Sequence, residues 1–390
     1  MKNNRKPNKF LFLCAQFLAG AAAGLGFIVL LFSSMPQVLA LPPLAYALAL
    51  VGCAAWMLLT AWMHILLHEA GHLLGGLCSG YRFVSYRVGK TIWMRRDGRL
   101  VRGRYTVAGT GGQCLMAPPG SPYGPFPYIL YNAAGGLAHL AAGALLALVG
   151  LACPPSLPRF LLLGAALTGG VTAVLNLLPM GGNDGANIAS LRRSEDARRA
   201  LWVTLAANAF LTEGGAARAL PADWLAFPPP DSDTEALVLG VHALRAEKLL
   251  DNGDLSGAAA LTRLLLDSCP RLWPVQKSEL QCQLLLLTLI LDGPGPDANT
   301  LYGPALQKYI RATAGYPARQ CLLYALAVLR DGDGTAARRA RAALAAIGPE
   351  YPHPAEIEQC LGLARRIDEA ARVRDGQSKA DECAAEMPRI

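Results

Sequence analysis

His68, Glu69 and His72 combine the residue types and the spacing that could bind a metal ion and use it in hydrolysis. Four residues of an α-helix turn by about 400° and rise by about 6 Å, so the imidazoles of His68 and His72 would leave one helix face one turn apart. Two imidazoles so placed can share one Zn²⁺ ion at about 2.1 Å from each. Glu69 could then take a proton from a water molecule that the metal activates. The alternative is an ordinary structural helix, because this five-residue pattern also occurs by chance.

Asp184 is the third ligand that the sequence predicts. Pro179 and the glycines after it end the preceding helix, so Asp184 is expected at the end of that helix. Two antiparallel membrane crossings separate this point from His72, which puts both residues at the same depth. A carboxylate there would complete a His₂Asp set and leave a fourth position for water, as in catalytic zinc sites. Without the two histidines, Asn183-Asp184-Gly185 would indicate only a helix-terminating turn.

Two further histidines lie in apolar segments. His64 is one turn before His68 on roughly the same face, but no Glu follows it as Glu69 follows His68. His139 has no partner at ligand spacing. Both are therefore predicted to be interior histidines that hydrogen-bond or pack among helices, and ligation by either one is the alternative.

The motif lies in a chain with the composition of a membrane protein. Of its 390 residues 53% are hydrophobic, and the mean hydropathy is positive. Four apolar runs are long enough to cross a bilayer of about 30 Å, at residues 10–32, 41–67, 126–153 and 160–178. The first is longer than the apolar region of a signal peptide, so cleavage near residue 40 is the less favoured alternative. Ionisable residues inside such spans are costly and usually functional, which favours a metal site.

The basic charge follows the pattern of membrane topology. The net charge is +8, and much of the basic charge flanks the apolar runs, as at residues 2–9 and 192–199. We therefore expect an integral, multi-pass cell-membrane protein with both termini in the cytoplasm, and no nucleic-acid partner. The ten cysteines are scattered without a Cys-x-x-Cys pair, which predicts reduced or lipid-buried thiols instead of a disulfide framework.

Residues 81–118 are predicted to form a basic, β-rich cytoplasmic loop. Apolar and polar residues alternate in 81–88 and 100–107, and Asp97-Gly98 lies between these runs, which predicts a small β-hairpin. Such a sheet could offer a strand edge to an extended substrate. A loop that faces lipid headgroups explains the same sequence equally well. The glycine- and proline-rich stretch 109–124 is predicted to be a turn region.

The remaining chain is expected to form a cytosolic helical domain. Residues 191–232 are predicted to be a linker or helical connector, and residues 233–390 the domain itself. Segments 249–270 and 329–349 each read as helix, Gly-Asp turn, alanine-rich helix and proline. They resemble degenerate tetratricopeptide-type repeats, which often bind proteins, and a plain helical bundle is the alternative. The predicted fold class is mainly α: a polytopic membrane protein with about four transmembrane helices, a small β-hairpin insert and a repeat-like, α-helical soluble domain.

Two motifs together resemble the site-2 protease family of intramembrane zinc metalloproteases. The membrane-buried His-Glu-x-x-His is followed, near the end of a later span, by Asn176-x-x-Pro-x-x-x-x-Asp184-Gly. The resemblance covers about residues 41–189 and implies the family's core of three transmembrane helices. We therefore predict an N-terminal transmembrane helix in 1–40 and an intramembrane metalloprotease core in 41–190. The residue before the Asp is Asn183, where the family usually has Leu. The resemblance implies zinc ligation by His68, His72 and Asp184, general-base catalysis by Glu69, and a hydrogen bond from Asn176 to the substrate or the tetrahedral intermediate.

The expected function is intramembrane proteolysis of a regulatory kind. A zinc endopeptidase would hydrolyse a membrane-anchored protein substrate near the cytoplasmic face. Its partners would be this substrate, the lipid bilayer and a protein bound to the helical domain. The alternative is a non-catalytic membrane scaffold whose helical domain recruits partners and whose metal site is structural or lost, but a scaffold has no need of Glu69. A metallopeptidase of the prenyl-protein-processing type would use Glu as the third ligand, and the sequence from Asn176 to Gly185 argues against it.

Overall fold

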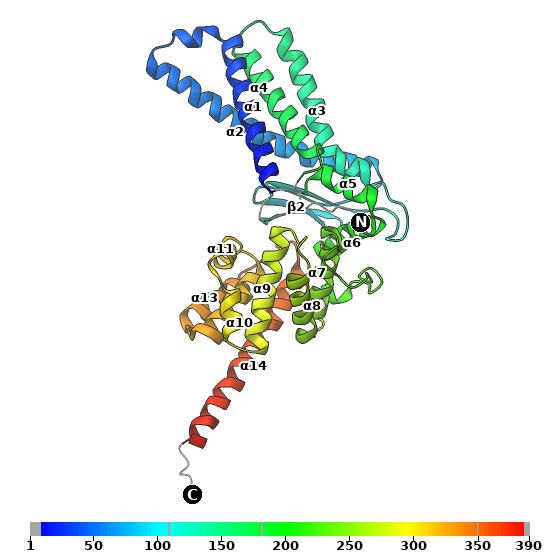
Figure 1. Ribbon diagram of the computed structural model, residues 1–390, viewed down its shortest axis with the longest axis vertical. Coiled ribbons are helices and arrows are strands. Elements are labelled where there is room, and N and C mark those ends of the chain that lie inside the picture. Colours follow the sequence, from blue (N-terminus) through cyan, green and yellow to red (C-terminus); the bar gives the residue numbers. More distant parts are fainter. Residues whose placement is uncertain (1–8, 108–109, 181, 349, 386–390) are drawn as a thin grey trace. The chain divides into compact units, whose positions relative to one another are not determined.

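The chain divides into two compact units in a computed structural model that describes residues 9–385 except 108–109, 181 and 349 (Figure 1). The first unit comprises Met1–Gly89 and Gly111–Arg198, and the second comprises Lys90–Thr110 and Arg199–Ile390. Most of the described chain is helical, and its strands are short and antiparallel. The predicted N-terminal positive charge falls on residues 2–9, of which 2–8 lie outside the described residues.

In the described part of the first unit, four helices are long and apolar enough to cross a membrane. They are α1 (Lys9–Ser34), α2 (Pro43–Cys78), α3 (Tyr128–Ala152) and α4 (Leu157–Leu177), with a short 3₁₀ helix, η1 (Pro36–Ala40), between the first two. They coincide with the four predicted spans. The His-Glu-x-x-His motif lies inside α2, so the predicted helical presentation of the motif is confirmed.

The surface of α2 has the polarity of a membrane helix. Its exposed side chains include Leu44, Leu58 and Met63, and Leu58 is 74% exposed. Its buried side chains include the polar Thr60 and His64, which hydrogen-bond to α4. A helix in water would bury its apolar face and expose its polar one. The reverse arrangement is expected where lipid is the solvent, and it supports association with a membrane.

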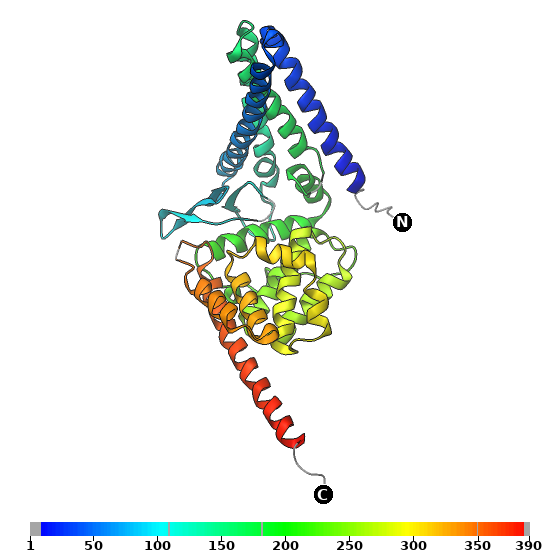
Figure 2. The same ribbon diagram turned by 90° about the vertical axis from the view of Figure 1, so that its left-hand side faces the viewer.

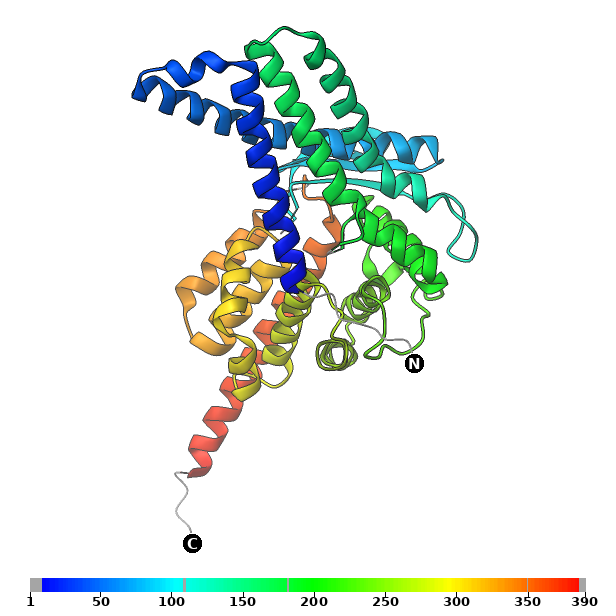
Figure 3. The ribbon, with the colours of Figure 1, turned by 45° about the horizontal axis from the view of Figure 1, so that its top comes forward.

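Close packing places the motif-bearing helix against α3. The helix α3 packs mainly against α4 and α2, and α1 packs against α4 (Figure 3). A Cβ built on Gly71 would lie 2.4 Å from the carbonyl oxygen of Ala134, and one built on Gly75 would lie 2.3 Å from the Ala134 Cβ. Such approaches need glycine and are typical of helix crossings in membranes. Side chains of α2 and α3 can therefore meet in one site.

Strands β1 (Arg82–Val88) and β4 (Gly112–Ala117) form an antiparallel pair in the first unit. Tyr86 lies opposite Cys114, and the Tyr86 hydroxyl donates to the carbonyl oxygen of Leu66 at 2.8 Å, which holds the pair against α2. The prediction of a turn region over 109–124 is therefore wrong for β4. Its glycine-rich surroundings suggested a turn, whereas the buried segment from Cys114 to Met116 is stabilised by pairing with a strand far back in the chain.

Strands β2 (Thr91–Arg96) and β3 (Arg99–Arg104) form the predicted hairpin, which belongs to the second unit. Asp97 and Gly98 make its turn, with φ of 50° and 76°. Positive φ at both central positions matches the right-handed twist of the two strands, and Asp-Gly tolerates this geometry. The hairpin is thus confirmed, although its first strand is 91–96 instead of 81–88.

The hairpin packs on the helical part of the second unit. Arg96 Nη2 donates to the carbonyl oxygens of Tyr351 at 3.0 Å and Pro352 at 3.4 Å. The Tyr105 ring centroid lies 5.8 Å from that of Tyr316 and 5.7 Å from that of Tyr351. These contacts explain why a short insertion early in the chain belongs to the same compact unit as the C-terminal helices.

The rest of the described second unit is helical. Asp254 and Asp333 cap two of its helices by accepting hydrogen bonds from backbone amides, at the Gly-Asp turns that the sequence indicates. Figure 2 shows α14 running on beyond the other helices of this unit. Whether these helices form a true repeat stays a prediction. The helices are α6 (Glu195–Thr212, which begins in the first unit), η2 (Ala217–Ala219), α7 (Ala236–Asp251), α8 (Leu255–Ser268), α9 (Pro274–Leu291), α10 (Pro296–Leu301), α11 (Pro304–Ala312), α12 (Pro317–Ala325), the π-helical turn η3 (Leu326–Asp331), α13 (Gly334–Ala345) and α14 (Pro354–Ala385).

Candidate metal centre

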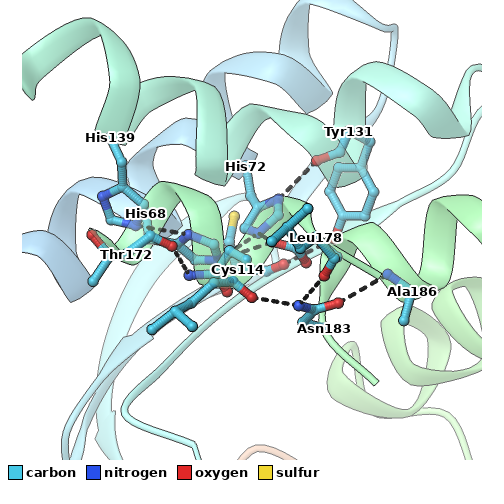
Figure 4. A network of polar contacts seen from close by, with 12 residues as sticks. His68, His72, Cys114, Tyr131, His139, Thr172, Leu178, Asn183 and Ala186 are labelled. Atoms are coloured by element: carbon cyan, nitrogen blue, oxygen red, sulfur yellow. Dashed lines mark hydrogen bonds and ion pairs between the residues drawn. The ribbon is translucent and has the colours of Figure 1, made fainter. Parts of the chain in front are cut away.

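The two histidines of the motif point their Nε2 atoms at each other from one face of α2. His68 Nε2 and His72 Nε2 are 3.0 Å apart, and the two rings meet nearly at right angles. The Nδ1 atom of His72 donates to the carbonyl oxygen of Tyr131 on α3 at 2.7 Å (Figure 4). Because a carbonyl oxygen only accepts, this bond assigns the proton to Nδ1 and leaves a lone pair on His72 Nε2.

Asp184 is the first residue of a short helix, α5 (Asp184–Arg193), which follows the end of α4. Asn183 builds the turn between them. Its Nδ2 atom donates to the carbonyl oxygens of Leu175 at 2.5 Å and Leu178 at 2.7 Å, and its Oδ1 accepts from the amide of Ala186 at 2.9 Å (Figure 4). Asn183 thus joins the end of one helix to the start of the next and fixes the position of Asp184.

The turn also requires the glycine that follows Asp184. A Cβ built on Gly185 would come within 2.1 Å of the carbonyl oxygen of Leu177. The Asn-Asp-Gly sequence therefore does not simply terminate a helix. Asn183 caps the next helix, Asp184 begins it, and Gly185 allows its first turn to lie against the end of α4.

The three candidate ligand atoms stand at the separations that a tetrahedral metal ion would impose. Asp184 Oδ2 is 3.2 Å from His68 Nε2 and 3.4 Å from His72 Nε2. Ligands about 2.05 Å from a tetrahedral ion are about 3.3 Å apart. Asp184 Oδ2 is buried and has no hydrogen-bond partner among the described residues. The residues therefore fit a His₂Asp site for a divalent cation, and the predicted triad is brought together.

Asp184 is set up to be an anionic ligand. Burial by itself would raise the pKa of its carboxyl group. When His68 and His72 carry protons on Nε2, their hydrogen bonds and positive charge act in the opposite direction and outweigh burial, so that the pKa of Asp184 is lowered to about 2. At neutral pH the carboxylate is ionised and available to a cation.

Glu69 lies beside the triad and is not part of it. Its side chain is buried, and its carboxylate accepts a hydrogen bond from the backbone amide of Cys114 on β4. A Cβ built on Gly112 would lie 2.6 Å from Glu69 Cγ, so the β4 backbone passes directly over this side chain. The strand therefore both orients Glu69 and closes one side of the space around it.

His64 and His139 lie behind the triad. His139 Nε2 is 3.2 Å from His68 Nδ1, and the two rings are stacked (Figure 4). His139 Nδ1 is in turn 3.1 Å from His64 Nδ1. Neither residue joins the group of atoms that could hold the ion. Both are the hydrogen-bonded interior histidines that the sequence predicts.

Asn176 makes a local contact. Its Nδ2 atom donates to the carbonyl oxygen of Thr172 within α4 at 2.9 Å. No hydrogen bond among the described residues joins it to His68, His72 or Asp184. Asn132 likewise donates to Tyr128 within its own helix. The residues that sequence reasoning missed are Asn183 and Cys114, which position Asp184 and Glu69.

Comparisons with protein-family models, with curated proteins and with solved structures each found no match to this chain.

Proposed function

We propose that this chain is an intramembrane zinc endopeptidase, similar to the site-2 proteases, that cleaves a membrane-anchored protein near the cytoplasmic face, with both of its own termini in the cytoplasm. One observation carries the proposal. His68 Nε2, His72 Nε2 and Asp184 Oδ2 stand at tetrahedral ligand separations beside the buried Glu69. This group lies within and next to helices that are apolar enough to cross a membrane.

The donor set suits zinc, since two neutral imidazoles and one carboxylate leave a fourth position open, as in catalytic sites. A bound zinc ion would supply a Lewis acid that polarises the scissile carbonyl and acidifies a water molecule. Glu69 takes a proton from that water as general base and returns it to the leaving amine nitrogen. The water oxygen adds to the carbonyl carbon, the C–N bond breaks, and the second water proton is released with the products, a carboxylate and an amine. The Cys114 amide holds Glu69 in place during both transfers.

Asn176 is proposed to hydrogen-bond the substrate. One of its two amide hydrogens is used within α4, in the bond to Thr172. The second remains to donate to a substrate carbonyl or to the developing oxyanion. A substrate helix must unwind at the cleavage point first, because its carbonyls are occupied by internal hydrogen bonds.

The backbone contacts of Cys114 argue against the hypothesis that an extended substrate pairs with a strand edge of the sheet. Its amide donates to Glu69, and its carbonyl oxygen accepts from the Tyr131 hydroxyl at 3.0 Å. Both backbone groups of this residue are therefore engaged. An extended substrate could pair with β4 at Cys114 only by displacing them, so substrate binding by strand addition is not part of the proposal.

The first experiment measures bound metal by elemental analysis of detergent-purified wild type, Asp184→Ala and Glu69→Gln. We expect about one zinc per chain in wild type and in Glu69→Gln, and a clear loss in Asp184→Ala. Zinc that is absent from folded wild type under metal-replete conditions would overturn the proposal and leave the scaffold. Zinc that is retained in Asp184→Ala would mean that another residue supplies the third ligand.

The second experiment separates a protease from a scaffold with a structural metal. Membranes from cells that produce wild type or Glu69→Gln are compared for new protein termini by mass spectrometry. We expect termini within or next to transmembrane segments in wild type alone, because Glu69→Gln keeps the ligands and loses the base. Identical termini in both samples, with zinc bound in both, would favour the scaffold.

A further inference from the structure

A chain of hydrogen bonds leads from the metal centre to a backbone carbonyl of α4. It runs from His68 on α2 to His139 on α3, then to His64 on α2, and ends at the carbonyl oxygen of Ala165. The three distances are 3.2 Å, 3.1 Å and 3.0 Å. His64 and His139 are both at most 5% exposed. Neither residue has a place in the proposed mechanism, so this series of hydrogen bonds needs an explanation of its own.

The carbonyl at the end of the chain sets the direction of every bond. It can only accept, so His64 Nε2 donates to Ala165 and His64 Nδ1 is left as an acceptor. His139 Nδ1 must then donate to His64, which leaves His139 Nε2 as an acceptor. His68 Nδ1 donates to His139 in turn, and the lone pair of His68 is left on Nε2, the atom that faces Asp184. Neutral rings are required, because an extra charge among apolar helices and beside a divalent cation is costly.

Both ligand histidines thus donate their Nδ1–H towards a backbone carbonyl, one directly and the other through further imidazoles. His72 reaches a carbonyl directly, at Tyr131, whereas His68 reaches one only through two more imidazoles. A metal-ligating histidine usually fixes its tautomer and ring orientation by donating its other N–H in this way. If the hydrogen bonds from His68 to Ala165 ran in the opposite direction, the lone pairs of His64 Nε2 and of the Ala165 oxygen would face each other.

The neighbouring helices leave room for these rings. A Cβ on Gly135 would lie 2.5 Å from His68 Cε1, and one on Gly169 would lie 2.8 Å from His64 Cε1. Glycine on α3 and on α4 therefore accommodates an imidazole at each end of the chain. The rings are held by hydrogen bonds along the chain and by backbone packed against their faces.

We propose that His139 and His64 are positioning residues of the metal centre, which hold His68 as the Nδ1–H tautomer and aim its Nε2 lone pair at the metal. This inference rests on the metal site of the proposed function, but not on peptide hydrolysis. It assigns His139 the larger effect, because His139 contacts the ligand itself and His64 acts through it.

The test is the zinc affinity of full-length protein in detergent, measured by competition with a chelator in the Glu69→Gln background. Loss of a group that orients a metal ligand typically weakens binding about 10- to 100-fold. We expect a loss in this range for His139→Ala and a smaller loss for His64→Ala. His139→Gln should retain more affinity than His139→Ala, because its amide oxygen can still accept from His68.

Trp56→Phe is the matched control. The Trp56 Nε1 atom donates to the carbonyl oxygen of Leu161 at 3.1 Å, so this variant also removes one bond from a ring on α2 to the α4 backbone. We expect its zinc affinity to equal that of the parent. A His139→Ala affinity within about twofold of the parent would overturn the inference, and so would an equal loss in Trp56→Phe.

A measurement without any variant covers the case in which His139→Ala does not fold. Nitrogen-15 NMR of histidine-labelled, zinc-loaded protein distinguishes the two tautomers of each ring. We expect protons on His139 Nδ1 and His64 Nε2, and the opposite tautomers would overturn the inference. If zinc affinity and tautomers are as expected but wild type and Glu69→Gln yield the same protein termini, the proposed protease activity fails and this inference stands. Wild type that binds no zinc would overturn both.

Discussion

Gly135 on α3 lies directly against the His68 ring on α2, so close that a Cβ built on the glycine would meet His68 Cε1 at 2.5 Å and Nδ1 at 2.6 Å. Real Cβ atoms do not approach a ring so closely. Any side chain at position 135 must therefore move the imidazole or push the two helices apart. The geometry of the metal centre thus depends on a residue that has no side chain and binds nothing.

Gly135→Ala should weaken zinc binding. Alanine favours a helix over glycine by about 1 kcal/mol, so the substitution costs nothing in helix propensity and acts through the contact alone. We expect the zinc affinity, measured by chelator competition, to fall at least about tenfold. Gly52→Ala is the control, since no atom lies within 4 Å of a Cβ at that position of α2. Equal affinity in the two variants would show that His68 can move without consequence.

Gly112→Ala should separate metal binding from catalysis. A Cβ here would lie 2.6 Å from Glu69 Cγ and 2.7 Å from its Oε1, so the carboxylate must leave its position beside the Cys114 amide. Because the three atoms nearest to this Cβ all belong to Glu69, we expect zinc content to stay at the wild-type level. We expect the yield of protein termini that depend on Glu69 to fall about 100-fold, within the usual range for loss of general-base catalysis. Unchanged yield would mean that Glu69 is not the base, or that its position is not critical.

Asn183 offers a graded test of the turn that carries Asp184. Replacing a capping Asn by Ala costs about 1 kcal/mol, and here two further bonds to the end of α4 are also lost. We expect Asn183→Ala to weaken zinc binding clearly. Asn183→Ser keeps an oxygen for the Ala186 amide and loses the Nδ2 donors that reach Leu175 and Leu178, so its affinity should lie between those of Asn183→Ala and wild type. Equal zinc affinities of the serine and alanine variants would show that zinc binding depends only on the Asn183 bonds to the end of α4.

The approach of Asp184 to His68 and His72 could be expected from sequence although the residues are far apart in the chain. Apolar runs of membrane-spanning length force antiparallel crossings, and an even number of crossings returns the chain to the same depth. The spacing in the motif then selects which face of α2 meets the carboxylate. That these atoms bind zinc remains a prediction, because proximity alone does not establish ligation.

Other features carried little local signal. The contact of His139 with His68 depends on how α2 and α3 are rotated about their axes, and a single histidine in an apolar run does not report that rotation. Strand β4 is not predicted by its own sequence, because its stability comes from pairing with β1, whereas the glycines around it suggest a turn. Asn183 does carry a signal, since an Asn before an acidic residue at a helix start is a typical N-cap, but Pro179 and the glycines after it predict a helix end at the same place.

The attachment of the hairpin to the second unit can be tested at Gly103. A Cβ on this residue of β3 would lie 2.3 Å from the carbonyl oxygen of Glu350, so only glycine fits. Gly103→Val should push the hairpin away from that segment, and hydrogen exchange of the amides of β2 and β3 should quicken at least about tenfold. Leu100→Ala, at a side chain that is 65% exposed on the same strand, should leave exchange unchanged. Equal exchange in both variants would contradict tight packing of the hairpin.

A half-buried carboxyl group, that of Glu356, should make the second unit less stable as the pH rises towards neutrality. Burial is the main reason why the pKa of Glu356 is raised to about 7 from an ordinary value of 4.5. The nearby Glu247 raises it further, and the hydrogen bond from the Tyr351 hydroxyl opposes this. A raised pKa in the folded state means that the folded protein binds the proton more tightly. This stabilisation is complete below pH 4.5 and is lost as the pH rises through 7.

The loss should be on the order of 2 kcal/mol, since the side chain is only partly buried. Hydrogen exchange of α12 and α14 in the full chain, corrected for the intrinsic effect of pH, measures it. Glu356→Gln cannot ionise, so its protection should vary much less with pH. Glu358→Gln, at an exposed position two residues further along the same helix, should retain the wild-type dependence of protection on pH. Protection that is constant or rises with pH in wild type would show that Glu356 is already ionised in the folded protein at low pH, and that the contacts with Tyr351 outweigh its burial.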